Sequence, residues 1–142
     1  MASSVFDSRL LQNVWSTKEM REVFSEENRM QKWLDYEAAL ATEQGDMGII
    51  PKEAAKEIAY RAKVEFIDMA KVLQETALTK HSLVPTVRGL EHACRNGHGE
   101  YLHFGPTTQD VIDTGLMLQL KQAHTIVLRD LKKIGQILYK LS

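Results

Sequence analysis

The stretch from Thr108 to the end of the chain, TQDVIDTGLMLQLKQAHTIVLRDLKKIGQILYKLS, decides the fold class. It runs for more than thirty residues without a proline, and its apolar side chains recur at intervals of three and four, the spacing of one face of an α-helix. The seam comprises Ile112, Leu116, Gln119, Leu120, Ala123, Ile126, Val127, Leu131, Ile134, Leu138 and Leu141, with Gln119 as its polar member. At ~1.5 Å per residue, the predicted helix over 108–141 is about 50 Å long.

A rod of this length needs a partner for its apolar seam. The upstream helical segments are short, and nothing caps the helix at Leu141-Ser142. We therefore expect the long helix either to pack against copies of itself or to belong to a bundle completed by chain beyond this piece.

The rest of the chain also has helical periodicity, and no sustained alternation of period two indicates a strand. We predict an all-α fold. The predicted helices cover residues 17–24, 26–46, 51–62, 67–79, 85–95 and 108–141.

Local signals set several of these ends. Ser16 and Glu19 have the spacing of a capping box, and Pro51 suits the first position of a helix because its missing N–H has no partner there. Gly45 and Gly48 are expected to loosen and end the helix over 26–46. The segment KEAAKEIAYRAK is expected to be a brief, solvated helix.

The helix over 26–46 carries one stripe in which Glu37 is the single charged member among apolar residues. Met30 and Trp33 of this helix, and Trp15 before it, are predicted to be core residues.

Composition excludes several classes of protein. The 142 residues carry 18 basic and 19 acidic side chains, for a net charge of −1, which argues against a nucleic-acid binder. No apolar run approaches the roughly 20 residues that span a bilayer, so no membrane partner is expected. The lone Cys94 and an N-terminus without an apolar core predict a cytoplasmic protein.

The segment HFGPTTQD, residues 103–110, is the strongest candidate for chemistry. A Gly-Pro turn delivers Thr107 and Thr108 to the N-terminus of the longest helix, where free N–H groups and the helix dipole favour an anion. His103 is a hydrogen-bond donor or proton carrier near neutral pH. The alternative is a plain capping box, with Thr107 as N-cap and Asp110 as the acid three positions on. The anion site and the capping box can coexist, since both use N–H groups of the same turn.

Two other polar features are weaker. His81 lies in a break between helices, where a histidine more often caps carbonyls than does chemistry. His92, Cys94, His98 and His103 raise the possibility of zinc, but they lack the paired close ligands of structural zinc sites.

The segment HFGPTTQDVIDTG resembles the first signature region of the fumarase/aspartase superfamily. Its form is closest to the branch of adenylosuccinate lyase and 3-carboxy-cis,cis-muconate cycloisomerase, on the basis of Gln109, Ile112, Asp113, Thr114 and Gly115 followed by LMLQLK. Two upstream blocks support the resemblance. They are EMREVFSEENRMQKWLDYEAALATEQGDMGIIPKEAA, similar to the N-terminal helical domain of that branch, and LTKHSLVPTVRGL, similar to its second helix break.

The resemblance implies a fold, an assembly and a reaction. It divides the chain into an N-terminal helical domain, 1–104, and the start of a long central-bundle helix, 105–142. It implies a homotetramer around a twenty-helix bundle. The reaction is β-elimination, usually releasing fumarate, after proton removal next to a carboxylate; the muconate enzyme runs the related lactonisation. Neither reaction requires a metal or another cofactor.

The same resemblance assigns the residues of the turn. Thr107 and Thr108 are implied to hold a substrate carboxylate, with Thr108 standing where the family usually has serine. Gln109 is implied to line the substrate pocket, and Asp110 to orient the turn. The expected substrate is a small polycarboxylate or a succinyl-nucleotide.

His103 and His81 match pocket histidines that contact substrate or assist proton transfer. The later signatures, which carry the acid and the base, are absent from this piece, and family active sites combine three subunits. We therefore expect the 142-residue chain alone to be inactive.

The start of the chain departs from the adenylosuccinate lyase pattern. Those enzymes often have an Arg-Tyr pair that contacts the nucleotide phosphate, whereas residues 3–8 here read SSVFDS. This difference argues against a purine substrate and favours the cycloisomerase-like branch. An alternative of another class is a non-catalytic helical module that oligomerises through its long helix.

Overall fold

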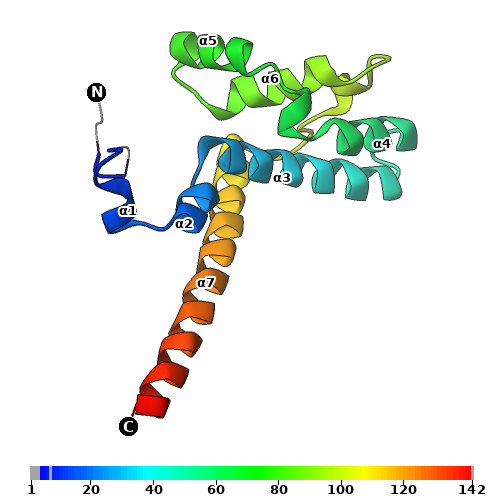
Figure 1. Cartoon of the computed structure of the whole chain (residues 1–142). Coiled ribbons are helices and arrows are strands. Elements are labelled where there is room, and N and C mark those ends of the chain that lie inside the picture. The colour runs from blue at the N-terminus through cyan, green and yellow to red at the C-terminus, as the bar shows by residue number, and fades with distance from the viewer. Residues whose placement is uncertain (1–3, 7, 142) are drawn as a thin grey trace. The chain divides into compact units, whose positions relative to one another are not determined.

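The computed structural model describes residues 4–6 and 8–141, and every regular element in this part of the chain is a helix (Figure 1). The all-α prediction is confirmed. The elements are α1 (Gln12–Trp15), α2 (Lys18–Val23), α3 (Glu26–Asp46), α4 (Lys52–Arg61), the 3-10 turn η1 (Val64–Phe66), α5 (Met69–Thr79), α6 (Leu83–Ala93), the 3-10 turn η2 (His98–Tyr101) and α7 (Thr108–Leu141).

The six predicted helices are all present, with α3 and α7 at their predicted bounds. The prediction for α6 was wrong at both ends, because the helix begins at Leu83 and ends at Ala93. Pro85 lies inside its first turn, where a missing N–H removes no helical hydrogen bond.

The predicted cap of α2 was wrong by one residue. The N-cap is Thr17, whose side chain accepts a hydrogen bond from the backbone N–H of Met20 at 3.2 Å. The Ser16 hydroxyl instead donates to the carbonyl of Gln12 at 2.7 Å and accepts from Arg21. Two adjacent hydroxyl residues gave an ambiguous signal that only the backbone geometry resolves.

The contacts of the chain form two compact units, residues 30–116 and the pairing of Met1–Arg29 with Met117–Ser142. Each is considered by itself below. A domain boundary between residues 104 and 105 stays a prediction.

The main core of residues 30–116 joins α3, α4, α5 and α6. Leu34, Ile58 and Leu90 are fully buried at its centre. The helix α4 is therefore not merely solvated, as its charged sequence suggested, because Ala54 and Ile58 are also removed from solvent.

Gly45 lets α3 and α4 approach closely. A Cβ at this position would lie 2.5 Å from the Cβ of Ala55, closer than two non-bonded carbons can approach. Gly45 is buried within α3 and does not loosen it, whereas Gly48 has a φ of 73° and follows the helix end, as expected.

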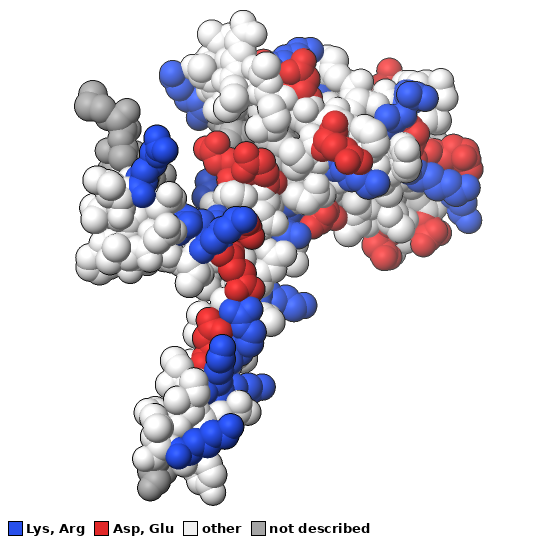
Figure 2. Space-filling view, in the orientation of Figure 1, with Lys and Arg blue, Asp and Glu red and all other residues white. Residues whose placement is uncertain are grey.

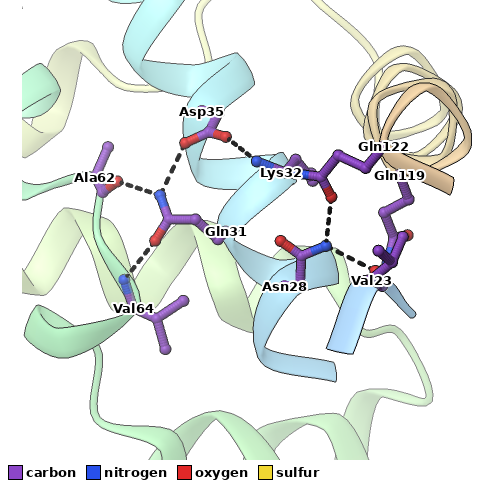
Figure 3. A network of polar contacts seen from close by, with 9 residues as sticks. All are labelled: Val23, Asn28, Gln31, Lys32, Asp35, Ala62, Val64, Gln119 and Gln122. Carbon is purple, nitrogen blue, oxygen red and sulfur yellow. Dashed lines mark hydrogen bonds and ion pairs between the residues drawn. The ribbon is translucent and has the colours of Figure 1, made fainter. Parts of the chain in front are cut away.

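Gln31 fastens the loop after α4 to α3 (Figure 3). Its side-chain amide donates to the carbonyl of Ala62 at 3.0 Å and to Asp35 at 2.9 Å, and its oxygen accepts from the N–H of Val64 at 3.0 Å. Lys32 pairs with the other oxygen of Asp35 at 2.8 Å. Backbone groups outside the helices are thereby satisfied.

A second, smaller core brings three helices together near the predicted site. Trp33 of α3, Leu83 of α6 and Val111 of α7 form this cluster, with Tyr36 and Val87 packed against it. The first turns of α6 and α7 therefore share a core with the middle of α3.

In the other unit, buried polar groups join α2 to α7 (Figure 3). The amide of Gln119, only 1% exposed, donates to the carbonyl of Val23 at 2.7 Å, and Asn28 donates to that carbonyl and to Gln122. Gln119, the polar member of the seam, therefore satisfies the carbonyl at the end of α2.

The core prediction for the three large residues was correct for Met30 and Trp33, each 6% exposed, and wrong for Trp15, which is 65% exposed. Trp15 ends the four-residue helix α1, and none of the residues of α1 is buried.

The far part of α7 leaves its apolar side chains exposed. The exposed members are Met117, Leu120, Val127, Leu128, Leu131, Ile134, Ile137, Leu138 and Leu141. We call this set the α7 stripe. Acidic and basic side chains are interspersed on the face drawn in Figure 2. No helix of the described residues is long and apolar enough to span a membrane.

Candidate functional site

The turn before α7 has an unusual backbone. His103 and Gly105 both have positive φ, 57° and 99°. Glycine adopts this conformation readily, but for a histidine it is uncommon and costs energy. The backbone thus holds the histidine of the motif in a strained position, and strain of this kind concentrates at functional sites.

Two hydrogen bonds tie the turn to α3. The side-chain amide of Gln44 donates to the carbonyl of Phe104 at 2.7 Å, and Nδ1 of His103 lies 2.6 Å from Oε1 of Glu37. Glu37 and Gln44 are seven residues apart in α3, so both side chains leave the same face of the helix. The position of the turn is therefore set by α3.

Glu37 is the most enclosed charged group at the site. It is 1% exposed, and its second carboxylate oxygen, Oε2, has no hydrogen-bond partner among the described residues. Burial raises the pKa of Glu37 above its ordinary value, whereas the hydrogen bond and the charge of His103 act to lower it. The pKa of Glu37 is raised overall, because desolvation is the largest of these effects.

The start of α7 has the geometry of one half of a capping box. The backbone N–H of Thr107 donates to Oδ2 of Asp110 at 2.8 Å. The side chains of Gln109 and Asp113 pair along the helix at 2.7 Å. The hydroxyls of Thr107 and Thr108 make no hydrogen bond among the described residues, so capping leaves both available to a ligand. Thr107 is exposed and Thr108 half-buried.

Tyr36 links the buried pair to the helix start. Its pKa is raised by burial and then by the negative charges of Asp110 and Glu37. Both carboxylates therefore act on one phenol, whose ring packs on the cluster of Trp33, Leu83 and Val111.

His81 has a local structural contact. Its Nδ1 accepts a hydrogen bond from the N–H of Val84 at 3.3 Å, in the first turn of α6. The shared core places the starts of α6 and α7 against α3, but among the described residues no hydrogen bond or ion pair joins His81 to His103 or to the threonines. The arrangement brings together His103 and Glu37 with Thr107–Asp110 following, and leaves His81 as a neighbour at the start of another helix.

Within residues 4–6 and 8–141, no three His, Cys, Asp or Glu side chains gather closely enough to hold a metal ion.

Sequence reasoning did not assign Glu37, Gln44 or Tyr36 to the site. One signal pointed to Glu37, a charged residue in the middle of the apolar stripe of α3. Glu37 and His103 are 66 residues apart, so no local pattern relates them.

The chain is similar in sequence to proteins named as lyases. It is 48% identical over 142 residues to N-acetyl-S-(2-succino)cysteine lyase of Enterococcus italicus, and 41% identical over 124 residues to adenylosuccinate lyase of Methanocaldococcus jannaschii. These alignments cover 100% and 87% of this chain, but 31% and 27% of the relatives. The chain thus spans less than a third of their length.

The fold has a solved counterpart as well. The structure of 3-carboxy-cis,cis-muconate lactonizing enzyme from Pseudomonas putida superposes with a TM-score of 0.84 and 33% identity, over 91% of this chain and 30% of that enzyme. No protein-family model matches the chain. Sequence and fold nevertheless agree: the homologues and structural neighbours of this chain are members of the fumarase/aspartase superfamily, and the chain matches an N-terminal fragment of such a protein.

Proposed function

We propose that this chain is the N-terminal part of a lyase that releases fumarate from a succinyl adduct by β-elimination. The observation that carries the proposal is the turn over residues 103–110. There a histidine paired with a buried glutamate precedes two unpaired hydroxyls at the N-terminus of a 34-residue helix. These are groups that bind a carboxylate and stabilise negative charge.

In such an elimination a base removes the proton from the carbon next to a carboxylate, giving an aci-carboxylate. The bond from the neighbouring carbon to the leaving group then breaks, its electron pair departs with that group, and a proton is supplied to it. Thr107 and Thr108 are proposed to hold a substrate carboxylate through their hydroxyls and the free N–H groups of the first turn. Gln109 and Asp110 line and shape the pocket.

His103 is the proposed histidine of this piece that touches substrate. His81 is proposed to border the same pocket from the start of α6, which shares the Trp33 core with α7. The acid and base of the elimination belong to later segments of the family pattern, so this piece binds and polarises the substrate and does not complete the reaction.

For the substrate we favour a succinyl thioether. The chain is 48% and 43% identical, over all 142 residues, to two proteins named N-acetyl-S-(2-succino)cysteine lyase. Residues 3–8 also lack the Arg-Tyr pair expected for a nucleotide phosphate; Ser3 and Asp7 of that stretch lie outside the described residues.

The test is an assay of the full-length protein with N-acetyl-S-(2-succino)cysteine and, separately, with adenylosuccinate, following fumarate by ultraviolet absorbance. We expect fumarate from the thioether and none from the 142-residue chain alone. If the full-length protein released no fumarate from either substrate or from other succinyl adducts, the proposal would be contradicted.

The second candidate is cycloisomerisation of 3-carboxy-cis,cis-muconate. The favouring observation is the TM-score of 0.84 with the Pseudomonas putida lactonizing enzyme. The same assay with 3-carboxymuconate distinguishes the two, because lactonisation consumes the diene without releasing fumarate.

The proposed assembly is a cytoplasmic homotetramer, in which the α7 stripe is covered by helices of the other subunits. The exposed stripe supports this, since exposed apolar patches of this kind mark interfaces. It equally suits a non-catalytic oligomerisation module, but such a module has no need of a buried Glu37–His103 pair.

A further inference from the structure

We propose that Glu37 is a positioning residue for His103, holding the imidazole through Nδ1 so that Nε2 faces the substrate. The inference rests on the proposed function, since it concerns the same site. Its evidence is the geometry of the pair and the energetic cost of keeping it.

The contact is short and enclosed. Nδ1 of His103 and Oε1 of Glu37 are 2.6 Å apart, with side chains 20% and 1% exposed. Hydrogen bonds that involve an ionised group are shorter and stronger than neutral ones. Among the described residues His103 makes no other side-chain hydrogen bond, so Nε2 remains free for a ligand.

The pair also fixes which nitrogen carries the proton. An ionised carboxylate only accepts hydrogen bonds, and a neutral imidazole has a single N–H. With Glu37 ionised, the contact of 2.6 Å between Nδ1 and Oε1 is a hydrogen bond only if Nδ1 carries the proton. Nε2 then presents a lone pair to the pocket, able to accept a proton or a hydrogen bond.

Three features at this point work against stability. Glu37 places a carboxyl group in a core where every other member of its stripe is apolar, its Oε2 has no partner, and His103 adopts a left-handed backbone. Each is unfavourable, and a leucine with an ordinary turn would avoid all three. A role confined to folding does not account for this combination, whereas orienting a histidine does.

The first experiment is a double-mutant cycle in the full-length enzyme. Glu37→Gln keeps the shape but replaces an obligate acceptor with an amide that can donate to Nδ1, which permits the wrong tautomer. We expect kcat to fall about 10²-fold, the size of effect that misplacement of a reacting group produces, with a smaller change in KM. Glu43→Gln, the same change at an exposed position of α3, is the control and should leave kcat unchanged.

In the His103→Ala background, Glu37→Gln should lower kcat no further than two-fold. An equal loss in both backgrounds would overturn the proposal, because Glu37 would then act independently of His103. Unchanged kcat in the single Glu37→Gln variant would overturn it as well.

A second measurement needs no turnover. In the full-length protein labelled with ¹⁵N-histidine, the His103 resonances are identified by their loss in His103→Ala. We expect the wild-type ring to carry its proton on Nδ1 and the Glu37→Gln variant to shift toward the Nε2–H tautomer. A wild-type ring protonated on Nε2, or one that Glu37→Gln leaves unchanged, would overturn the pairing. If the tautomer shifts while no succinyl adduct is turned over, the positioning stands and the proposed function fails.

Discussion

Thr107 and Thr108, at the start of α7, are the residues at which binding and folding can be separated. Capping of α7 in the structure uses the N–H of Thr107 and the carboxylate of Asp110, and leaves the Thr108 hydroxyl unpaired. We therefore expect Thr108→Ala to lower kcat of the full-length enzyme by a factor corresponding to about 3 kcal/mol, the loss of one preorganised donor. Thermal unfolding should change little.

The control is Asp68→Ala, which removes the N-cap of α5, where the carboxylate accepts from the N–H of Lys71 at 3.2 Å. Loss of that cap should cost about 1 kcal/mol of stability and leave kcat unchanged. If Thr108→Ala behaved like Asp68→Ala, lowering the melting temperature alone, the helix start would be only a cap.

Cys94 should be a poorly reactive thiol. Its burial raises the pKa to about 11, with the nearby charge of Glu57 adding to the effect. The thiolate is the reactive form, so at pH 8 the folded chain should react with a disulfide reagent far more slowly than the same chain in urea. The rate should rise as pH approaches 11. A folded chain that reacts as fast as the unfolded one would contradict this prediction.

Residue-level prediction from sequence succeeded where the signal was local. Thr107 and Asp110 are three positions apart and were recognisable as capping partners, and the structure joins them. Glu37 was visible only as an anomaly, because its partner lies in a turn that the chain reaches 66 residues later. The partner of a buried charge depends on tertiary packing, which no local spacing encodes.

At the scale of elements, replacing either of two glycines of α7 by alanine is expected to change stability in opposite directions. A Cβ at Gly115 would lie 2.6 Å from Cδ1 of Trp33, whereas a Cβ at Gly135 would meet nothing within 4 Å. Gly115→Ala should therefore destabilise the chain by about 1–3 kcal/mol through overpacking. Gly135→Ala should stabilise it by up to about 1 kcal/mol, because alanine is the better helix former.

Both variants are measured by thermal unfolding of the 142-residue chain, followed by far-ultraviolet circular dichroism. They share a helix and a substitution, so their difference isolates the contact with Trp33. Equal shifts in the two variants would show that α7 does not pack on Trp33 through Gly115.

Helices were predictable from this sequence because periodicity and end signals agree along most of the chain. The bounds of α3 and α7 were predicted correctly, since each has a long apolar face and a clear break at its start. Errors arose where signals compete, as at Ser16 and Thr17, or where burial depends on a neighbour. Trp15 looks like a core residue by type alone, yet α1 buries none of its residues.

At the scale of the whole molecule, the α7 stripe predicts assembly. Ile134 and Leu138 are 51% and 61% exposed, and nothing in the described chain covers them. Burying such side chains is favourable by about 25 cal/mol per Å², so a helix that exposes a continuous row of them gains from a partner. We expect full-length protein to be a tetramer by light scattering, and the 142-residue chain to self-associate with rising concentration.

The decisive variant places charges on the stripe. Ile134→Glu with Leu138→Glu should lower the measured mass of the full-length protein, because two buried, unpaired carboxylates would oppose association. The matched control is Lys132→Glu with Gln136→Glu, which has the same spacing on the opposite side of α7 and should keep the tetramer. A stripe variant that keeps the wild-type mass, or a wild type that is strictly monomeric, would show that the stripe is no interface.

Because family active sites combine several subunits, the same stripe variant should also lose turnover in proportion to the tetramer it loses, although its turn over residues 103–110 is intact.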